Sequence, residues 1–166
     1  MASWSAFTAA DPSLATAVRA LFEQYGPGMA YLATIRPDGG PRLHPVSPVF
    51  TDQGLYCFVI PSPKRQDLER DGRYALHSFP AEESDDEAYL TGNAIRVHDR
   101  TAIATLADAL RASPDVDWHL YELHIHQATL RRHGPAGALP LAASPAVAPV
   151  SRTWRADLSR PLALAS

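Results

Sequence analysis

The strongest chemical pattern in this sequence is the run Ser62-Pro63-Lys64-Arg65, which opens a short helix expected over residues 64–71. Serine and proline favour the first positions of a helix. The start of a helix presents free backbone N–H groups and the positive end of its dipole, so cations there are unfavourable unless an anion lies between them. The hydroxyl, ammonium and guanidinium can each donate to a phosphate. The run therefore predicts a phosphate site, although a surface helix with incidental basic residues has the same pattern.

Lys64 is the only lysine among the 15 basic residues, which draws attention to its position. The overall charge of −3 gives no basic field, so nucleic acid and an anionic membrane are not expected as partners. No apolar window is long enough to span a membrane, and the N-terminus lacks a signal-peptide pattern, so we expect a cytoplasmic protein. The single cysteine, Cys57, excludes an intramolecular disulfide and lies in an apolar run typical of buried positions.

The 166 residues are enough for one core and too few for two ordinary domains, so residues 1–166 are interpreted as a single domain. Its N-terminal segment, 1–28, contains a helix over residues 12–25, and Asp99 is expected to cap another helix over residues 100–112. Residues 134–150 are rich in Pro, Ala and Gly and are expected to form a loop. Strands are predicted over residues 29–35, 41–50, 55–60, 73–79, 88–97 and 118–131, with a last short one over 151–155.

These strands follow one another mostly as hairpins, as in the turn Pro37-Asp38-Gly39. This order favours a mainly β (α+β) fold, a six-stranded antiparallel barrel with a few flanking helices, over alternating βα units. Within residues 41–50, Arg42, His44 and Val46 share one face of the strand. Three prolines interrupt it, so this strand is expected to be bulged or to lie at a sheet edge. Gly92-Asn93 marks a bulge in a later strand.

The order and spacing of these pieces resemble the flavin-binding split barrels of the pyridoxamine 5'-phosphate oxidase-like family. The resemblance is carried by Ala33-Thr34-Ile35-Arg36-Pro37-Asp38-Gly39, Pro41-Arg42-Leu43-His44-Pro45-Val46, Ser62-Pro63-Lys64 and Leu68-Glu69-Arg70-Asp71-Gly72-Arg73, and it weakens towards Arg131. It implies FMN bound at a homodimer interface, with its phosphate on Ser62 and Lys64 and its ring along residues 42–46. The cofactor-binding residues expected are Arg42, Leu43, His44, Pro45, Val46, Ser62, Lys64, Arg65 and Trp154.

The function implied by this resemblance is a flavin-dependent oxidoreductase acting on a small organic substrate. Because the cofactor would supply the chemistry, no catalytic side chain is assigned. Family members that use coenzyme F-420 or haem leave two alternatives, an F-420-dependent reductase and a non-catalytic flavin- or haem-binding carrier or sensor. The C-terminal arginine segment of the vitamin-processing oxidases is not recognisable here, and only Trp154-Arg155 remains in its place.

The histidines allow more than one interpretation. His44 is expected beside the ring, where it would hydrogen-bond the cofactor or the substrate, or else serve as a structural histidine. His124 and His126 share a strand face with Glu122, a pattern more typical of a solvated face than of a metal site. No metal site is therefore predicted.

Overall fold

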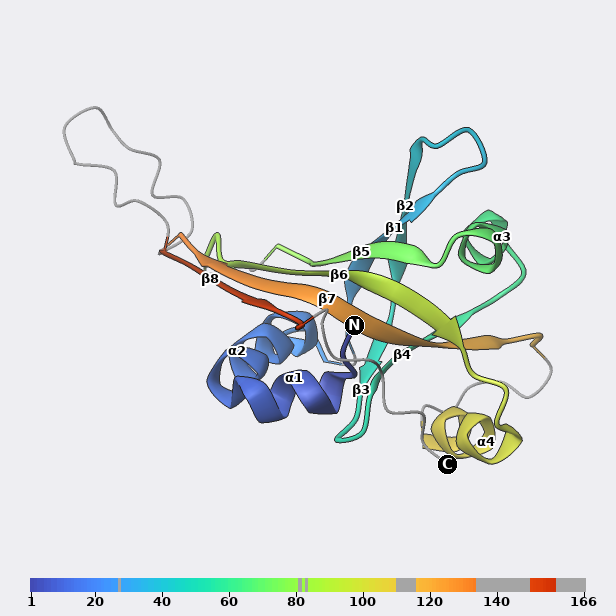
Figure 1. The fold of residues 1–166 in the computed structure, drawn as a ribbon, viewed down its shortest axis with the longest axis horizontal. Coiled ribbons are helices and arrows are strands. Elements are labelled where there is room, and N and C mark those ends of the chain that lie inside the picture. Colours follow the sequence, from blue (N-terminus) through green and yellow to red (C-terminus); the bar gives the residue numbers. More distant parts are fainter. Residues whose placement is uncertain (27, 81, 83, 110–115, 134–149, 158–166) are drawn as a thin grey trace.

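The computed structural model of the chain describes residues 1–26, 28–80, 82, 84–109, 116–133 and 150–157. Four helices and eight strands occur in these ranges (Figure 1). They are α1 (Trp4–Ala10), α2 (Pro12–Glu23), β1 (Ala30–Ile35), β2 (Pro41–Val46), β3 (Pro48–Phe50), β4 (Leu55–Val59), α3 (Pro63–Arg70), β5 (Arg73–Ser78), β6 (Glu87–Arg96), α4 (Arg100–Ala109), β7 (His119–Arg132) and β8 (Val150–Arg155). The loop predicted over residues 134–150 lies outside the described residues except for Val150, which begins β8.

All the strand pairings are antiparallel, and the strand order is β2-β1-β5-β6-β7-β4-β3, with β8 added on β7. The single strand predicted over residues 41–50 is two strands in the structure, β2 and β3. Ser47 separates them, and they occupy opposite ends of the strand order. The sheet therefore curls so that its two ends meet at Ser47. This confirms the mainly β antiparallel barrel, with eight strands where six were expected, because the interrupted strand divides in two and the short β8 joins the sheet.

The N-terminal segment contains one helix more than predicted. Asp11 ends α1 and also begins α2, where its side chain accepts a hydrogen bond from the Leu14 N–H at 3.1 Å. Pro12 follows at the first helical position, where a missing N–H costs nothing but where a continuous helix from α1 would be disrupted. Trp4 and Phe7 of α1 are buried, so this helix contributes to the core.

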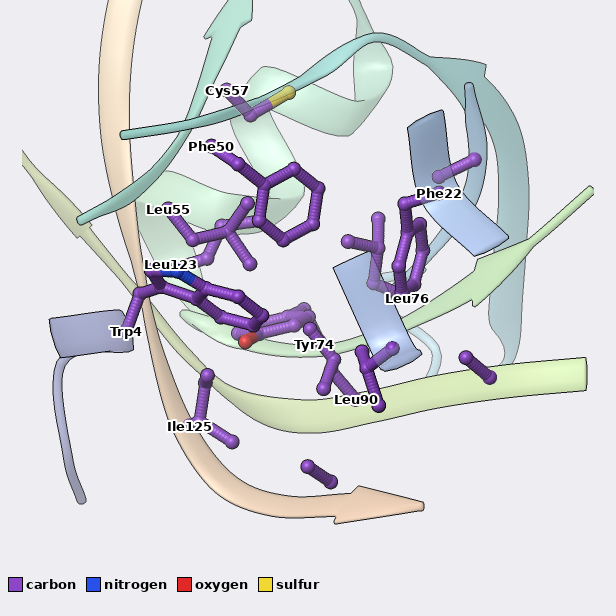
Figure 2. Close-up of a cluster of buried hydrophobic side chains, with 14 of the residues drawn as sticks. Trp4, Phe22, Phe50, Leu55, Cys57, Tyr74, Leu76, Leu90, Leu123 and Ile125 are labelled. Atoms are coloured by element: carbon purple, nitrogen blue, oxygen red, sulfur yellow. The ribbon is translucent and has the colours of Figure 1, made fainter. Parts of the chain in front are cut away.

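The core lies inside the curl of the sheet and is completed by α1 and α2, which lie side by side below the sheet in Figure 1, whereas α3 lies above it on the right. Trp4 packs edge-on against Phe50, and Phe22 approaches the same ring from α2. Figure 2 shows these rings converging with apolar side chains from several strands, among them Leu55, Cys57, Leu76, Leu90 and Leu123. The Cys57 thiol is buried as predicted, and burial raises its pKa to about 12, so it is an unreactive apolar side chain.

Gly92-Asn93 was expected to form a bulge in its own strand; the register does shift between Thr91 and Gly92 of β6, but the extra residue, His126, lies on the partner strand β7. The backbone of β7 approaches Gly92 so closely that a side chain at this position would overlap the His124 carbonyl group. Glycine is therefore required here by space, because no larger residue leaves room for the two strands to pair.

Candidate functional site

The first turn of α3 lies close to two strands that are distant from each other in the sheet. Burial lowers the pKa of His44 on β2 and the Lys64 charge lowers it further, whereas burial raises the pKa of Cys57 on β4 and the Lys64 charge only partly opposes this rise. Both strands therefore lie within electrostatic range of the ammonium. The helix itself packs on β1. Lys64 is half-buried, and among the described residues the ion pairs involve the arginines beside it but not Lys64 itself. The run that predicts an anion site and the strand that predicts a ring site are thus brought together.

A buried ion pair fixes α3 to the β1–β2 hairpin. The Asp67 carboxylate, 2% exposed, accepts hydrogen bonds from Arg42 Nε at 2.7 Å and from Thr34 Oγ1 at 2.9 Å. Burial raises the pKa of Asp67, but these hydrogen bonds and the Arg42 and Arg70 charges lower it by more, so that its pKa lies below the ordinary value. Arg42, predicted to hold the cofactor, therefore has a structural role that sets the position of α3 against β2.

His44 lies between these charged groups. Burial lowers its pKa, and the charges of Lys64 and Arg42 lower it further, outweighing the opposite effect of Asp67. The imidazole is therefore neutral at pH 7. Its Nε2 atom is buried and has no hydrogen-bond partner among the described residues, a costly state for a polar atom unless a ligand or water satisfies it. His44 thus has free hydrogen-bonding capacity at a buried atom, within electrostatic range of Lys64.

Ser62 and Arg65 have hydrogen-bond partners within the chain. Ser62 occupies the N-cap position of α3, but its hydroxyl donates to the Ile60 carbonyl at 2.8 Å instead of capping the helix. The Arg65 guanidinium donates to the Asp117 carboxylate at 2.8 Å. Of the three polar side chains in the run, only the Lys64 side chain has no such partner in the described part of the chain.

The other predicted site residues divide between the two faces of β2. Arg42, His44 and Val46 are half-buried on one face, as predicted, whereas Leu43 is 64% exposed on the other, together with Pro45. Trp154 lies on β8, where its ring packs on Phe7 with centroids 4.7 Å apart, far from α3 in Figure 1. Within one chain, Trp154 is therefore not brought to the Lys64 region.

The strand face with Glu122 and His124 is less solvated than predicted. His124 is 9% exposed, and its Nε2 lies 3.2 Å from Glu122 Oε2. Ala2 covers this part of β7 by pairing with Ile125 through two backbone hydrogen bonds. Among the described residues, no group of three His, Cys, Asp or Glu side chains is arranged to hold a metal ion.

A shallow cavity lies elsewhere in the molecule, between the two N-terminal helices and the turn before β4. Its lining includes Trp4, Thr16, Arg19 and Asp52. None of these residues belongs to the predicted site. None of the described helices has the length and apolar character that a membrane span requires.

The sequence matches no protein-family model and no curated protein. Several solved structures share its architecture. A protein related to general stress protein 26 of B. subtilis (pyridoxinephosphate oxidase family), from Clostridium acetobutylicum, is 13% identical with a TM-score of 0.57 over 91% of this chain and 95% of that one. An F-420 reductase is 18% identical, with a TM-score of 0.52 over 64% of this chain and 91% of that one.

A heme binding protein from Mycobacterium smegmatis is 19% identical, with a TM-score of 0.53 over 69% of this chain. The matched region is 52% of that protein, so this chain spans about half of its length. The chain has the split-barrel fold. The resemblance stated from the sequence is thereby confirmed for the fold, with sequence identities too low to carry the activity.

The open edges of this barrel belong to β2 at one end of the strand order and to β3, with the last residues of β4 beyond it, at the other. β2 is the last strand on its side, so its edge away from β1 has no neighbouring strand among the described residues. On the other side, β3 pairs only with residues 55–57, which leaves the end of β4 uncovered on that edge. One of these uncovered edges belongs to β2, the strand that carries His44. The other belongs to the last residues of β4, which precede α3. Backbone groups at such an edge need partners, which a ligand is able to supply.

Sequence reasoning missed three residues that shape this region: Thr34, Asp67 and Asp117. Each is polar and each contacts an arginine or its partner from a different element. Their separations in sequence follow no helical or strand period, so no pattern in the sequence links them. The burial of Asp67, next to the buried Leu68 on α3, is seen only in the structure.

Proposed function

We propose that this protein is a cytoplasmic flavin-dependent oxidoreductase that binds FMN at a homodimer interface and acts on a small organic substrate. The observation that carries the proposal is the meeting of Lys64, without an acidic partner in the described part of the chain, and the buried, unpartnered Nε2 of His44 at the split of the barrel. A cation and a neutral hydrogen-bonding group at a helix N-terminus suit a ligand with a phosphate at one end and polar ring atoms beyond it.

Different residues of this chain would contact different parts of such a ligand. Lys64 and the first turn of α3 would hold the phosphate, and His44 with the open edge of β2 would contact the remainder. Arg42 would act indirectly, by holding α3 in place through Asp67. FMN, when bound, supplies hydride and electron transfer, so the chain's own contribution is grip, orientation and the local electric field.

Two other ligands remain alternatives because proteins of the same fold are named for them. One solved structure is an F-420 reductase and another is a heme binding protein. A coenzyme F-420-dependent reductase would use the same cationic helix start for its phosphate. A flavin- or haem-binding carrier would bind its ligand without turnover.

The experiment that tests the proposal is a titration of purified protein with FMN, riboflavin, coenzyme F-420 and haem, followed by absorbance. We expect FMN to bind more tightly than riboflavin, because the helix start recognises the phosphate and not the ring. Equal affinity for FMN and riboflavin would remove the phosphate argument. Steady turnover of bound FMN with a reductant and an acceptor distinguishes the oxidoreductase from a carrier.

The homodimer is supported by the apolar outer face of the β1–β2 hairpin. Leu43 is 64% exposed, and its cross-strand neighbour Ala33 and the pair Tyr31 and Pro45 continue the same face. Such a patch on an edge strand is typical of surfaces that associate. We expect a dimer in sedimentation at micromolar concentration and a shift towards monomer in Leu43→Asp. A wild-type monomer that still binds FMN would contradict this part of the proposal.

A further inference from the structure

Arg65 and Lys64 are adjacent in the first turn of α3 but contact different parts of the molecule. Arg65 Nη1 donates to Asp117 Oδ2 at 2.8 Å and to the Asp117 carbonyl at 3.2 Å. The Arg65 side chain is 17% exposed, whereas that of Asp117 is 63% exposed. The guanidinium is therefore held by packing on one side, and its acidic partner is mostly in water.

A cluster of polar groups surrounds the Arg65 side of α3. His119 Nε2 accepts a hydrogen bond from Arg96 Nη2 at 2.8 Å, so the ring carries its proton on Nδ1. That Nδ1 lies 3.0 Å from Glu69 Oε1 but outside hydrogen-bonding geometry, and Glu69 Oε1 is also 3.9 Å from Arg65 Nε. The buried hydroxyl of Tyr121 has no partner among the described residues. The cluster thus surrounds Arg65 while some of its own polar atoms have no hydrogen-bond partner among the described residues. A rearrangement of Arg65 would therefore break few hydrogen bonds.

We propose that Asp117 competes with the ligand's phosphate for Arg65 and so sets the affinity of the site for phosphate-bearing ligands. This inference rests on the proposed function, because it concerns the same helix start. An ion pair whose carboxylate is largely in water contributes little, since solvent screens it. A phosphate offers several oxygens to the planar guanidinium and makes stronger charge-assisted hydrogen bonds. Asp117, once released, is already well hydrated.

Two features of the chain support an exchange of partners over a fixed role. Arg65 directly follows Lys64, so a phosphate held at Lys64 lies within the reach of a side chain as long as arginine. If Arg65 leaves Asp117, another cation is close to this carboxylate. Arg96 Nη2 lies 2.8 Å from His119 Nε2, and Asp117 Oδ1 lies 4.0 Å from the same nitrogen. The site then has one permanent cation, Lys64, and one that is recruited, Arg65.

The test is Asp117→Asn, which keeps the size of the side chain and removes its charge. We expect FMN to bind up to about fivefold more tightly, the range given by the worth of an exposed ion pair, with riboflavin unchanged. The control is the same substitution in an Arg65→Gln background, where only the general loss of negative charge acts. An equal gain with and without Arg65, or no gain in either background, overturns the proposal.

A second measurement is independent of flavin. Inorganic phosphate is titrated into the protein while the NMR signal of the Arg65 Nε–H group is followed, and we expect the signal to shift at lower phosphate concentration in Asp117→Asn than in wild type. A signal that does not respond to phosphate in either protein overturns the inference even if FMN binds through Lys64. A phosphate response of this kind without FMN binding supports the role of Asp117 and refutes the proposed function.

Discussion

Lys64→Ala is expected to weaken FMN binding by about 1.5–3 kcal/mol, or roughly ten- to a hundredfold, the scale of a hydrogen bond to a charged group. Lys64 is the cation of the α3 start that has no ion pair in the described part of the chain, so its loss is not compensated by a neighbour that already faces the same way. Its removal does not disturb the core and relieves an unfavourable charge at a helix N-terminus, so the apo-protein should keep its thermal stability.

Calorimetric titrations of both proteins at two salt concentrations measure this effect. Wild-type binding should weaken as salt rises and the Lys64→Ala variant should respond less, because salt screens the charge that was removed. Arg152→Ala is the matched control: it also removes one cation, but on β8, where Arg152 pairs with Asp11 at 2.9 Å. Equal loss of affinity in the two variants would point to net charge alone, and a collapsed melting temperature of apo Lys64→Ala would make Lys64 structural.

Arg42→Ala is expected to lower the free energy of unfolding of the apo-protein by about 1.5–3 kcal/mol at neutral pH, because it leaves the buried Asp67 carboxylate without its shortest hydrogen bond. Arg36→Ala is a matched control on the same hairpin, since Arg36 pairs with Asp38 at 2.5 Å but both side chains are well exposed. The control should cost about 1 kcal/mol or less. Urea unfolding of the three proteins gives the comparison directly.

The cost of Arg42→Ala should also depend on pH. The pKa of Asp67 is lowered in the folded protein, so its carboxylate contributes stability above its unfolded pKa, and this contribution is lost as pH falls through the folded value. Without Arg42, burial dominates and the pKa of Asp67 rises. The difference in stability should therefore shrink as pH falls, first as Asp67 is protonated in the folded variant and then, below about pH 4, as it is protonated in folded wild type. A difference that stays constant down to about pH 3 would show that Arg42 stabilises the fold through packing and not through this ion pair.

Local signals in the sequence were sufficient for much of the fold. Gly39 has a positive φ of 84°, as its place in the Pro-Asp-Gly turn predicts. Asp99 caps α4 by accepting from the Thr101 N–H at 2.8 Å. The prolines of residues 41–50 correctly predicted an edge strand, because a residue without an N–H is tolerated best where no neighbouring strand needs it.

The contacts across elements were not predictable in the same way. Alternation along β2 shows that Arg42 and His44 share a face, but it does not show that Asp67 of α3 lies against that face. The first-turn position of Arg65 suggested an anion ligand, and only the fold shows that Arg65 pairs with Asp117. Periodicity reports which side of an element is buried, whereas the partner on the other side depends on how distant segments pack.

The separation of β2 and β3 by Ser47 bears on the order in which we expect the sheet to assemble. The hairpins β1–β2 and β3–β4 involve neighbouring residues and can form early, but the β4–β7 pairing places Cys57 opposite Tyr121 and must wait until β5, β6 and β7 are in place. Pairings so distant along the chain form slowly. Because the candidate site joins β2 to α3, the helix that follows β4, an intermediate that contains only the two separate hairpins lacks it. We therefore expect the chain to bind its ligand only after β4 has paired with β7.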